Sequence, residues 1–243
     1  MTQHALPYRD RQSRGFFSTS SEPYGHSRLG APLLYFPAEI QHSGSGLIIA
    51  GTHGDETAST IALSCAMRSL APGHRHHHVI LAVNPDGCQL GIRSNANGVD
   101  INRNFPASNW QPGETVYRWS DATKARDVTL STGDAPGSEP ETQALCQLID
   151  RLSPPWVVSF HEPLACIDDP QCSVLGTWMA YHFSLPQVDN VGYGTPGSFG
   201  SWCADRALLC ITAELPVIAA DTANERYLDP MVNLLGHNFL YQI

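Results

Sequence analysis

GLIIAGTHGDE, residues 46–56, joins an apolar run to a polar turn. A short apolar run that ends in Gly is typical of a buried strand, and the residues after the turn are predicted to form a helix. His53 and Glu56 therefore lie at the carboxyl end of a strand, where open α/β sheets build their ligand sites. Two interpretations are open at this point. The two side chains face one metal ion, or the turn is a polar loop that caps the helix through Asp55 or Thr52.

Length and composition indicate one α/β domain with a large central sheet. The chain has 243 residues, of which 42% are hydrophobic, and this is enough for a full core. The formal net charge is −9 with only 14 Lys and Arg, which disfavours a nucleic acid or an anionic membrane as a partner. Because no repeat and no linker divides the chain, we expect an irregular N-terminal arm over 1–22 and a single domain over 23–243.

The cysteine pattern and the termini predict a cytoplasmic location. The seven cysteines are an odd number and include no CxxC pair, which is typical of reduced thiols in a reducing compartment. The N terminus has no apolar segment of signal-peptide length. No stretch approaches the roughly 18 apolar residues of a spanning helix.

Two further apolar runs end in residues that suit a metal site. WVVSF leads into His161, and LLCITA leads into Glu214. The carboxyl ends of strands in an α/β sheet lie along one edge, so both side chains can approach the turn that holds His53 and Glu56. Two His and one Glu are a standard ligand set for catalytic zinc, which keeps an open position for water. Glu214 is then placed to act as the general base.

Two polar segments are expected at the surface. Residues 74–78, HRHHH, suggest a metal site by composition. They run straight into the apolar residues 79–83, however, so solvated residues at the entry of a strand are the stronger interpretation. Residues 107–137 are rich in polar residues, Gly and Pro, and we expect a surface loop that borders the site.

Helices are predicted in three later segments. Ser138 and Glu141 match a capping box at the start of a helix that runs to about residue 152. Further helices are predicted near 174–184 and over 222–239.

The motifs GTHGDE, GVDINRNFP, SEPET, SFHEP and TAELP, in this order, resemble those of the zinc carboxypeptidase family. The resemblance covers roughly residues 24–240. It implies a three-layer α/β/α fold with a mixed, mostly parallel central sheet. It also implies one Zn²⁺ per chain, held by His53, Glu56 and His161, with Glu214 as the general base.

The same resemblance implies how a substrate is held. Asn102 and Arg103 are implied as the pair that binds the free carboxylate beside the scissile bond, and a guanidinium fork matches a carboxylate as a Lys would not. Arg93 is implied as the electrophile that stabilises the oxyanion. Tyr193, on a Gly-rich loop, matches the family's substrate-closing Tyr, and its alternative is an ordinary loop aromatic.

The activity that the resemblance implies is hydrolysis of the γ-D-glutamyl–meso-diaminopimelate bond of small murein peptides, in cell-wall peptide recycling. The leaving diaminopimelate carries an ammonium and a carboxylate at its D-centre. Asp168 and Asp169 are candidates for the ammonium, and Ser198 is a candidate for lining the pocket. The alternative for the two acids is a solvated turn before Pro170.

Three other functions compete with this interpretation. A zinc deacylase of the aspartoacylase or succinylglutamate desuccinylase type shares a turn like GTHGDE and an Asn-Arg pair, but it cleaves N-acyl amino acids. The SEPET motif and the spacing from SFHEP to TAELP favour the peptidase. A catalytically inactive zinc protein that only binds peptides would be expected to lack the base or the electrophile, and Glu214 and Arg93 are both present. A structural zinc site usually has four closed ligands, and no fourth ligand stands out.

Overall fold

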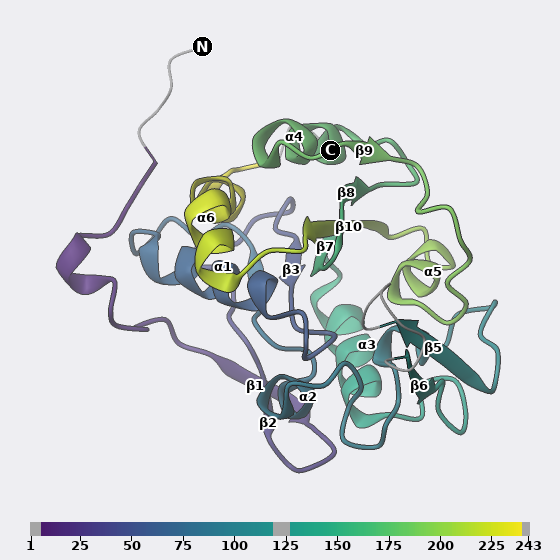
Figure 1. The fold of residues 1–243 in the computed structure, drawn as a ribbon. Coiled ribbons are helices and arrows are strands. Elements are labelled where there is room, and N and C mark those ends of the chain that lie inside the picture. The colour runs from purple at the N-terminus through teal and green to yellow at the C-terminus, as the bar shows by residue number, and fades with distance from the viewer. Residues whose placement is uncertain (1–5, 119–126, 240–243) are drawn as a thin grey trace.

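A mixed six-stranded sheet forms the centre of the computed structural model, which describes residues 6–118 and 127–239 (Figure 1). Its strands are β3 (Leu47–Ile49), β4 (His78–Ile80), β7 (Trp156–His161), β8 (Leu164–Asp168), β9 (Gln187–Val188) and β10 (Leu209–Pro216). The strand order is β4–β3–β7–β10–β8–β9. Strands β4, β3, β7 and β10 run parallel, whereas β8 is antiparallel to β10 and parallel to β9. The mixed, mostly parallel sheet implied by the motifs is confirmed.

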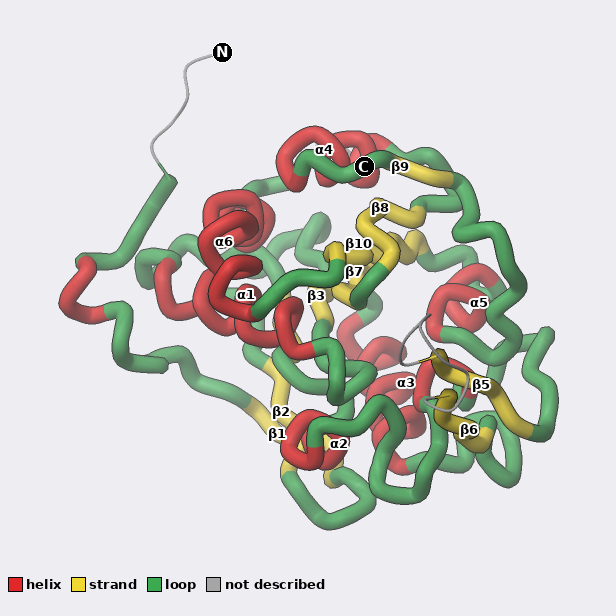
Figure 2. The backbone as a smooth tube through the Cα atoms, in the orientation of Figure 1, coloured by secondary structure: helices red, strands yellow, loops and turns green. Residues whose placement is uncertain are grey.

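Helices cover both faces of this sheet (Figure 2). One face carries α1 (Thr57–Ser69), α4 (Val174–Phe183) and α6 (Ala220–Gly236), whose apolar side chains form one core cluster with the strands. The other face carries α3 (Pro140–Leu152) and α5 (Phe199–Ala204), which contribute to a second cluster. The short helix α2 (Pro85–Leu90) follows β4. The three-layer α/β/α fold is therefore confirmed.

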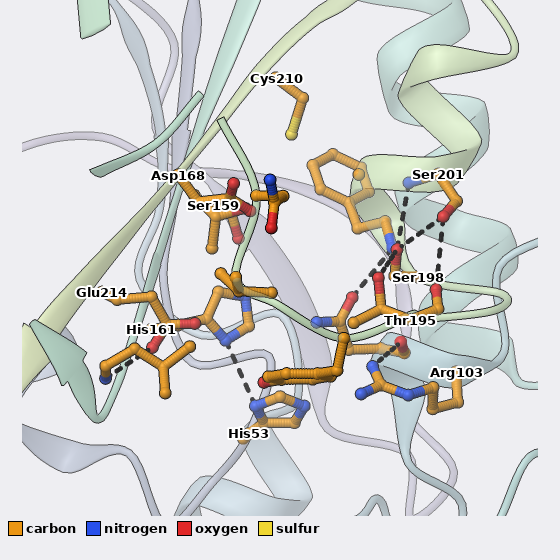
Figure 3. Close-up of a pocket in the computed structure, with 18 of the residues that line it drawn as sticks. His53, Arg103, Ser159, His161, Asp168, Thr195, Ser198, Ser201, Cys210 and Glu214 are labelled. Carbon is orange, nitrogen blue, oxygen red and sulfur yellow. Dashed lines mark hydrogen bonds between the residues drawn. The ribbon is translucent and has the colours of Figure 1, made fainter. Parts of the chain in front are cut away.

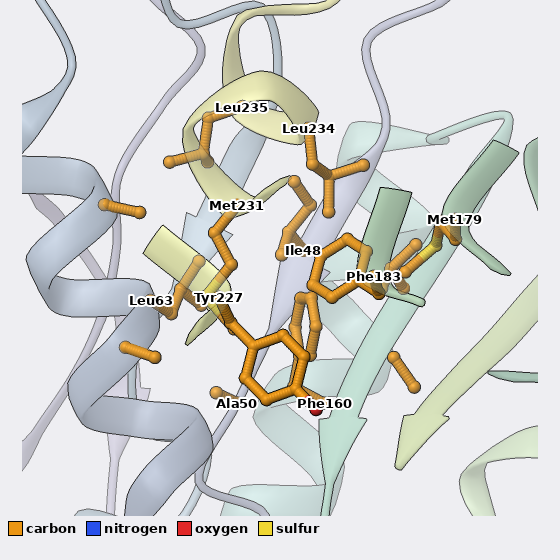
Figure 4. Packing of buried hydrophobic residues seen from close by; sticks show 14 of the residues in the cluster. Ile48, Ala50, Leu63, Phe160, Met179, Phe183, Tyr227, Met231, Leu234 and Leu235 are labelled. Atoms are coloured by element: carbon orange, nitrogen blue, oxygen red, sulfur yellow. The ribbon is translucent and has the colours of Figure 1, made fainter. Parts of the chain in front are cut away.

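The central strands are buried on both faces. Every residue of β3 and β7 is buried, as expected for parallel strands covered by helices on each side. Ile48 and Val158 belong to the cluster under α1 and α6, while Leu47 and Val157 belong to the opposite cluster. Tyr227 of α6 packs in the first of these (Figure 4). Full burial of an aliphatic side chain contributes about 1.5–3 kcal/mol to folding.

Two antiparallel strand pairs lie outside the central sheet. The first joins β1 (Glu22–His26) to β2 (Pro32–Tyr35), and Phe36 then bridges Val79 at the β4 edge. The second is a hairpin of β5 (Glu114–Arg118) and β6 (Asp127–Ser131). The prediction of a loop is wrong for these strands, because they pair with each other, but they remain largely exposed and β5 borders the cavity as predicted. Residues 119–126 of the predicted loop lie outside the described residues. A hydrogen bond from Asp100 N to Ser131 O (2.9 Å) anchors the hairpin. This bond also ties β6 to the segment that carries the Asn-Arg pair.

Helix α1 is not capped by the residues of its own turn. Glu56 occupies the N-cap position but its side chain makes no capping hydrogen bond. Instead, Oε1 of Glu162 accepts a hydrogen bond from Ser59 N (2.9 Å). The hypothesis of a cap by Asp55 or Thr52 is therefore wrong, because the carboxylate that serves this helix start comes from beyond the end of β7.

Helix α3 also begins differently from the predicted capping box. Its N-cap residue is Glu139, which makes no side-chain capping bond. The hydroxyl of Ser138 donates to Oε1 of Glu139 (2.8 Å) and accepts from Nδ2 of Asn104 (3.1 Å). The capping box of Ser138 and Glu141 is wrong because contacts outside the helix engage the Ser hydroxyl.

Residues 74–78 are less exposed than the sequence suggests. His77 is fully buried, and His78 is 4% exposed. The His77 ring packs against Trp156, with centroids 4.7 Å apart, and against Phe239, at 5.6 Å. The segment after α6 thus covers the entry of β4, and this long-range contact makes the prediction of solvated residues wrong for these two His.

The N-terminal arm lies against α1 and α6. Tyr8 donates a hydrogen bond to Asp229 of α6, and Arg9 N donates to Ser69 O (2.7 Å). From residue 6 onward, the arm contains a 3-10 turn, Arg11–Ser13, before β1, and residues 1–5 of the predicted arm lie outside the described residues. Among the described residues, no helix combines the length and the apolarity needed to cross a bilayer.

Candidate active site

The turn after β3 places His53 and Glu56 beside the end of β7. Gly51 has a φ of +65°, which an L side chain rarely adopts, and a Cβ on Gly54 would lie 2.0 Å from the carbonyl carbon of Gly87. Both glycines therefore let the turn between β3 and α1 pack closely against α2. Nδ1 of His53 lies 2.7 Å from Oε1 of Glu56.

His161, the last residue of β7, completes a group of three possible metal ligands (Figure 3). Its Nδ1 lies 3.3 Å from Nδ1 of His53 and 2.9 Å from Oε2 of Glu56. One ligand atom from each of the three residues can be chosen so that all lie within 4.8 Å of one another, and all three side chains are buried. Two nitrogens that each lie about 2.0–2.1 Å from a tetrahedral ion are about 3.3–3.4 Å apart. The spacing and the donor types therefore fit zinc.

Asp100 supports His53 from the side away from Glu56. Its Oδ1 lies 3.1 Å from Nε2 of His53, and its side chain also accepts a hydrogen bond from Asn102 N (3.0 Å). A carboxylate on the second ring nitrogen fixes the tautomer that leaves the other nitrogen free to bind a metal. Asp55 does not take this place, and its Oδ1 has no hydrogen-bond partner among the described residues.

Opposite charges keep the buried carboxylates of this group ionised. Burial alone would raise the pKa of Glu56, but His53 and His161 together lower it well below its usual value. Burial likewise opposes the charge of Asp100, whose pKa is held low by His53 and then by Arg93. The site therefore presents anionic oxygens beside imidazole nitrogens, which is the chemistry that a divalent cation needs.

Arg93 is held against this group by three contacts. Nη1 lies 2.9 Å from Oε1 of Glu56, and Nε lies 3.3 Å from Oδ2 of Asp100. The guanidinium also stacks over the ring of Tyr117, 4.4 Å from its centroid, and Tyr117 comes from the β5–β6 hairpin. The hairpin thus forms a wall of the site and restrains the Arg.

Glu214 lies beside His161 across the sheet. The two residues are Cα partners in the parallel pairing of β10 with β7. Glu214 is half-buried, and its Oε2 is 3.4 Å from the backbone nitrogen of Leu164. Burial raises the pKa of this carboxyl, His161 opposes the shift, and Glu56 adds to it. A carboxyl with a raised pKa that faces the ligand group is suited to take up and release a proton.

The Asn-Arg pair lies in a 3-10 turn, Ile101–Arg103, on the wall of the same cavity. Oδ1 of Asn102 accepts a hydrogen bond from Phe199 N (2.9 Å), which ties the turn to the start of α5. Nη1 of Arg103 donates to Asn102 O (2.7 Å). A Cβ on Gly197 would lie 2.6 Å from Arg103 O, so that glycine lets the loop before α5 approach the Arg.

The cavity has a volume of about 530 Å³ and collects most of the predicted site residues. It is lined by His53, Glu56, Arg93, Asn102, Arg103, His161, Asp168, Tyr193, Ser198 and Glu214, among others. Tyr193 lies on its rim with 58% of its side chain exposed. The hydroxyl of Ser198 is engaged in accepting a hydrogen bond from Ser201 N (3.1 Å) at the start of α5.

Asp169 is the predicted site residue that the structure does not bring to the cavity. It is fully buried, and its carboxylate accepts hydrogen bonds from the backbone and side chain of Ser173 and from Nε2 of Gln187. These contacts fix the start of α4. The prediction that Asp169 joins Asp168 at a substrate ammonium is therefore wrong, because the Asp169 carboxylate is taken up by Ser173 and Gln187 instead of lining the cavity.

Of the cavity residues that were not identified from the sequence, four bear on the chemistry of the site. Asp100 lies inside the GVDINRNFP motif, two positions before Asn102, so the motif itself offered a signal. Tyr117 had none, because the hairpin lies in a polar segment. Ser159 and Thr212 lie on β7 and β10, two residues before His161 and Glu214, and the period of a strand would have placed them on the same face.

Known proteins resemble this chain in sequence. The family model of the zinc carboxypeptidases matches residues 25–163. Murein peptide amidase A of Escherichia coli (strain K12) is 66% identical over 227 residues, which are 93% of this chain and 94% of that protein. Murein peptide amidase A of Vibrio campbellii is 55% identical over 228 residues, covering 94% of this chain and 92% of that protein.

Solved structures agree with this fold. The crystal structure of the murein-tripeptide amidase from Escherichia coli O157 superposes with a TM-score of 0.93 at 64% identity, over 96% of this chain and 99% of that one. Carboxypeptidase A from Helicoverpa armigera superposes with a TM-score of 0.66 at 17% identity, over 90% of this chain and 67% of that one, which shows a shared fold.

Proposed function

The chain belongs to the zinc carboxypeptidase family, and on that premise we propose that it is a murein peptide amidase. The reaction is hydrolysis of the γ-D-glutamyl–meso-diaminopimelate bond in L-Ala-γ-D-Glu-meso-diaminopimelate. The observation that carries the proposal is the convergence of two His and one Glu on a cavity that also holds Glu214 and Arg103. A relative 66% identical over 93% of the chain supports the substrate class.

In this proposal, His53, Glu56 and His161 hold one Zn²⁺ through two imidazole nitrogens and a carboxylate. When bound, zinc supplies Lewis-acid polarisation of the scissile carbonyl and lowers the pKa of water. Asp100 orients His53 so that Nδ1 rather than Nε2 faces the ion.

Glu214 is the general base and then the general acid. It takes a proton from the attacking water and delivers it to the nitrogen of the leaving amino acid. Its place opposite His161 in the strand register puts it beside the ligand group without making it part of that group. Arg93 places a guanidinium at the same group, where it stabilises the oxyanion of the substrate.

Arg103 and Asn102 bind the free carboxylate of the leaving amino acid. Both line the cavity, and the guanidinium fork can meet a carboxylate with two hydrogen bonds. This anchor confines cleavage to the last residue of the peptide. Tyr193, on the rim, covers the substrate from the open side.

The proposal includes a cytoplasmic location and a small murein peptide as the substrate. An odd number of cysteines without CxxC is typical of a chain kept in a reducing compartment.

Mass spectrometry of the products tests the proposal. The zinc-loaded protein is incubated with the murein tripeptide and, separately, with N-acetylaspartate and N-succinylglutamate. Release of free diaminopimelate together with L-Ala-D-Glu supports the peptidase. Turnover of the N-acyl amino acids without cleavage of the tripeptide would instead identify a deacylase of the aspartoacylase type.

A further inference from the structure

A row of three polar side chains crosses the floor of the cavity on adjacent strands. In the parallel pairing of β7 with β10, Ser159 is the partner of Thr212, and in the antiparallel pairing of β10 with β8, Thr212 is the partner of Asp168. All three line the cavity. Ser159, Thr212 and Asp168 are called the polar row below.

On β7 and β10, the polar row lies two residues before the catalytic residues. His161 and Glu214 are partners in the same register, two residues further along β7 and β10. Two residues along a strand span about 7 Å, and their side chains share a face. A substrate whose scissile bond lies at His161 and Glu214 can therefore reach the polar row with a side chain of about that length.

Two atoms of the polar row are buried without a partner. The hydroxyl of Ser159, a residue only 1% exposed, and Oδ1 of Asp168 have no hydrogen-bond partner among the described residues. Both residues are drawn at the cavity in Figure 3. Unpaired buried polar atoms cost free energy, and both atoms belong to residues that line the same cavity, so a ligand that forms hydrogen bonds with them recovers that cost.

The charge around Asp168 favours a cation. Burial raises the pKa of its carboxyl, and the neighbouring charges of Asp169 and Asp189 raise it further. Both of these neighbouring charges are anionic. A half-buried carboxylate that has no ion-pair partner within residues 6–118 and 127–239 gains from a cation that arrives with the substrate.

We propose that the polar row recognises an ammonium at the far end of the leaving amino acid, with Asp168 as its counter-ion and the Ser159 hydroxyl as a further acceptor. This inference rests on the proposed function. With the proposed substrate, the group is the ammonium of the D-centre of diaminopimelate. The side chain of diaminopimelate that carries this ammonium has a length comparable to the distance between the catalytic residues and the polar row. The polar row would therefore select diaminopimelate over amino acids that lack a distal cation.

Paired substrates test this inference. The tripeptide L-Ala-γ-D-Glu-meso-diaminopimelate is compared with the analogue that ends in L-2-aminopimelate, which keeps the distal carboxylate but lacks the ammonium. We expect kcat/KM of the wild type to be at least roughly 10- to 100-fold higher for diaminopimelate, as is usual for charged hydrogen bonds. A wild-type ratio near one would overturn the inference without any variant.

The Asp168→Asn variant should lower kcat/KM for diaminopimelate and leave the analogue nearly unchanged, so that the ratio collapses. Ser159→Ala should lower the ratio by a smaller factor. Asp189→Asn is the matched control, because Asp189 is an exposed rim residue and the same charge is removed. Its ratio should fall far less than that of Asp168→Asn, because water screens the exposed Asp189 carboxylate.

The outcomes separate the inference from the proposed function. If the wild type releases no diaminopimelate, the proposed function fails, and the inference fails with it. If the wild type is active but Asp168→Asn keeps the wild-type ratio, or if Asp189→Asn lowers the ratio as much, recognition by the polar row is wrong and the proposed function stands. Zinc content and thermal unfolding confirm that each variant is folded.

Discussion

Oδ1 of Asp100 lies 3.1 Å from Nε2 of His53, while Nδ1 of the same ring faces Glu56 at 2.7 Å. The two nitrogens of this His therefore have separate tasks. One is held by a carboxylate in the GVDINRNFP segment, and the other is presented to the candidate metal position. A carboxylate partner of this kind sets the ring orientation and raises the basicity of the ligand nitrogen.

Asp100→Asn should weaken zinc binding without unfolding the chain. The amide keeps the shape of the side chain and can still accept from Asn102 N, but it removes the charge beside His53. We expect zinc affinity to fall roughly 10- to 100-fold. Competition with a chromogenic chelator measures it. Asp55→Asn is the control, because it removes an equal charge from the neighbouring turn, and an equal loss of affinity in that variant would argue against a specific role of Asp100.

Glu214→Gln should abolish turnover while zinc stays bound. The amide cannot accept the proton of the attacking water, and removal of a general acid-base group typically costs about 10²- to 10⁴-fold in rate. Zinc content and inhibitor affinity should remain at wild-type levels, because Glu214 is outside the ligand group. Steady-state kinetics and metal analysis on the same preparation provide both readouts.

Glu162→Gln supplies the comparison for that variant. Glu162 also lines the cavity, but its carboxylate accepts from Ser59 N at the start of α1, and a Gln carbonyl can do the same. Its kcat should fall less than about tenfold, since no proton transfer is assigned to it. Equal losses in the two variants would contradict the role of Glu214 as the base.

The buried His77 predicts how stability depends on pH. Burial lowers the pKa of His77 to about 3, and the nearby His76, His42 and His78 contribute to the shift, although a hydrogen bond to His237 O opposes it. The pKa in the unfolded chain is about 6.5, so the unfolded state binds the proton more tightly. The stability that His77 contributes is therefore complete above about pH 6.5 and is lost as the pH falls toward 3.

Unfolding by urea between pH 8 and 4.5 checks this dependence. Below about pH 6.5, His77 should contribute a decrease of about 1.4 kcal/mol in unfolding free energy for each pH unit. His77→Asn should be less stable than the wild type at pH 8, and the difference should shrink toward pH 4.5. His74→Asn removes an exposed His and should keep the wild-type slope. The linkage to His77 is refuted if the two variants show the same slope.

The sequence was sufficient to predict where the main site residues lie, but not which other residues surround them in the cavity. His53, His161 and Glu214 each follow or end an apolar run, and parallel strands end at one edge, so their convergence could be predicted without coordinates. The polar row could not be predicted as such, because it requires the order β7–β10–β8 and the antiparallel direction of β8. Neither the strand order nor the direction of β8 can be predicted from the residue pattern of a single strand.

Long-range packing explains the other differences. His77 lies in a polar tract, but Phe239, which follows it by more than half of the chain, covers its ring. Tyr117 lies in a polar segment, and only its pairing in the hairpin brings it over Arg93. In both cases the deciding contact joins segments far apart in the sequence, so local hydrophobic periodicity carries no signal for it.

Arg103→Lys should show whether Arg103 binds the free carboxylate of the substrate. The guanidinium can form two parallel hydrogen bonds to a carboxylate, whereas an ammonium acts as a point charge. We expect kcat/KM for the murein tripeptide to fall roughly 10- to 100-fold, mainly through KM, because the lost bonds hold the substrate before and during reaction.

A second substrate, the tripeptide whose leaving residue has an amidated α-carboxyl, allows a double-mutant cycle. The two changes in the cycle are Arg103→Lys in the protein and amidation in the substrate. The wild type should cleave the amide far more slowly than the acid, and Arg103→Lys should add little further loss on the amide, because the two changes remove the same contact. Additive losses would place the carboxylate elsewhere in the cavity. In that case Arg103, whose Nη1 already donates to Asn102 O, would be a structural residue of the 3-10 turn rather than the anchor that makes the enzyme an exopeptidase.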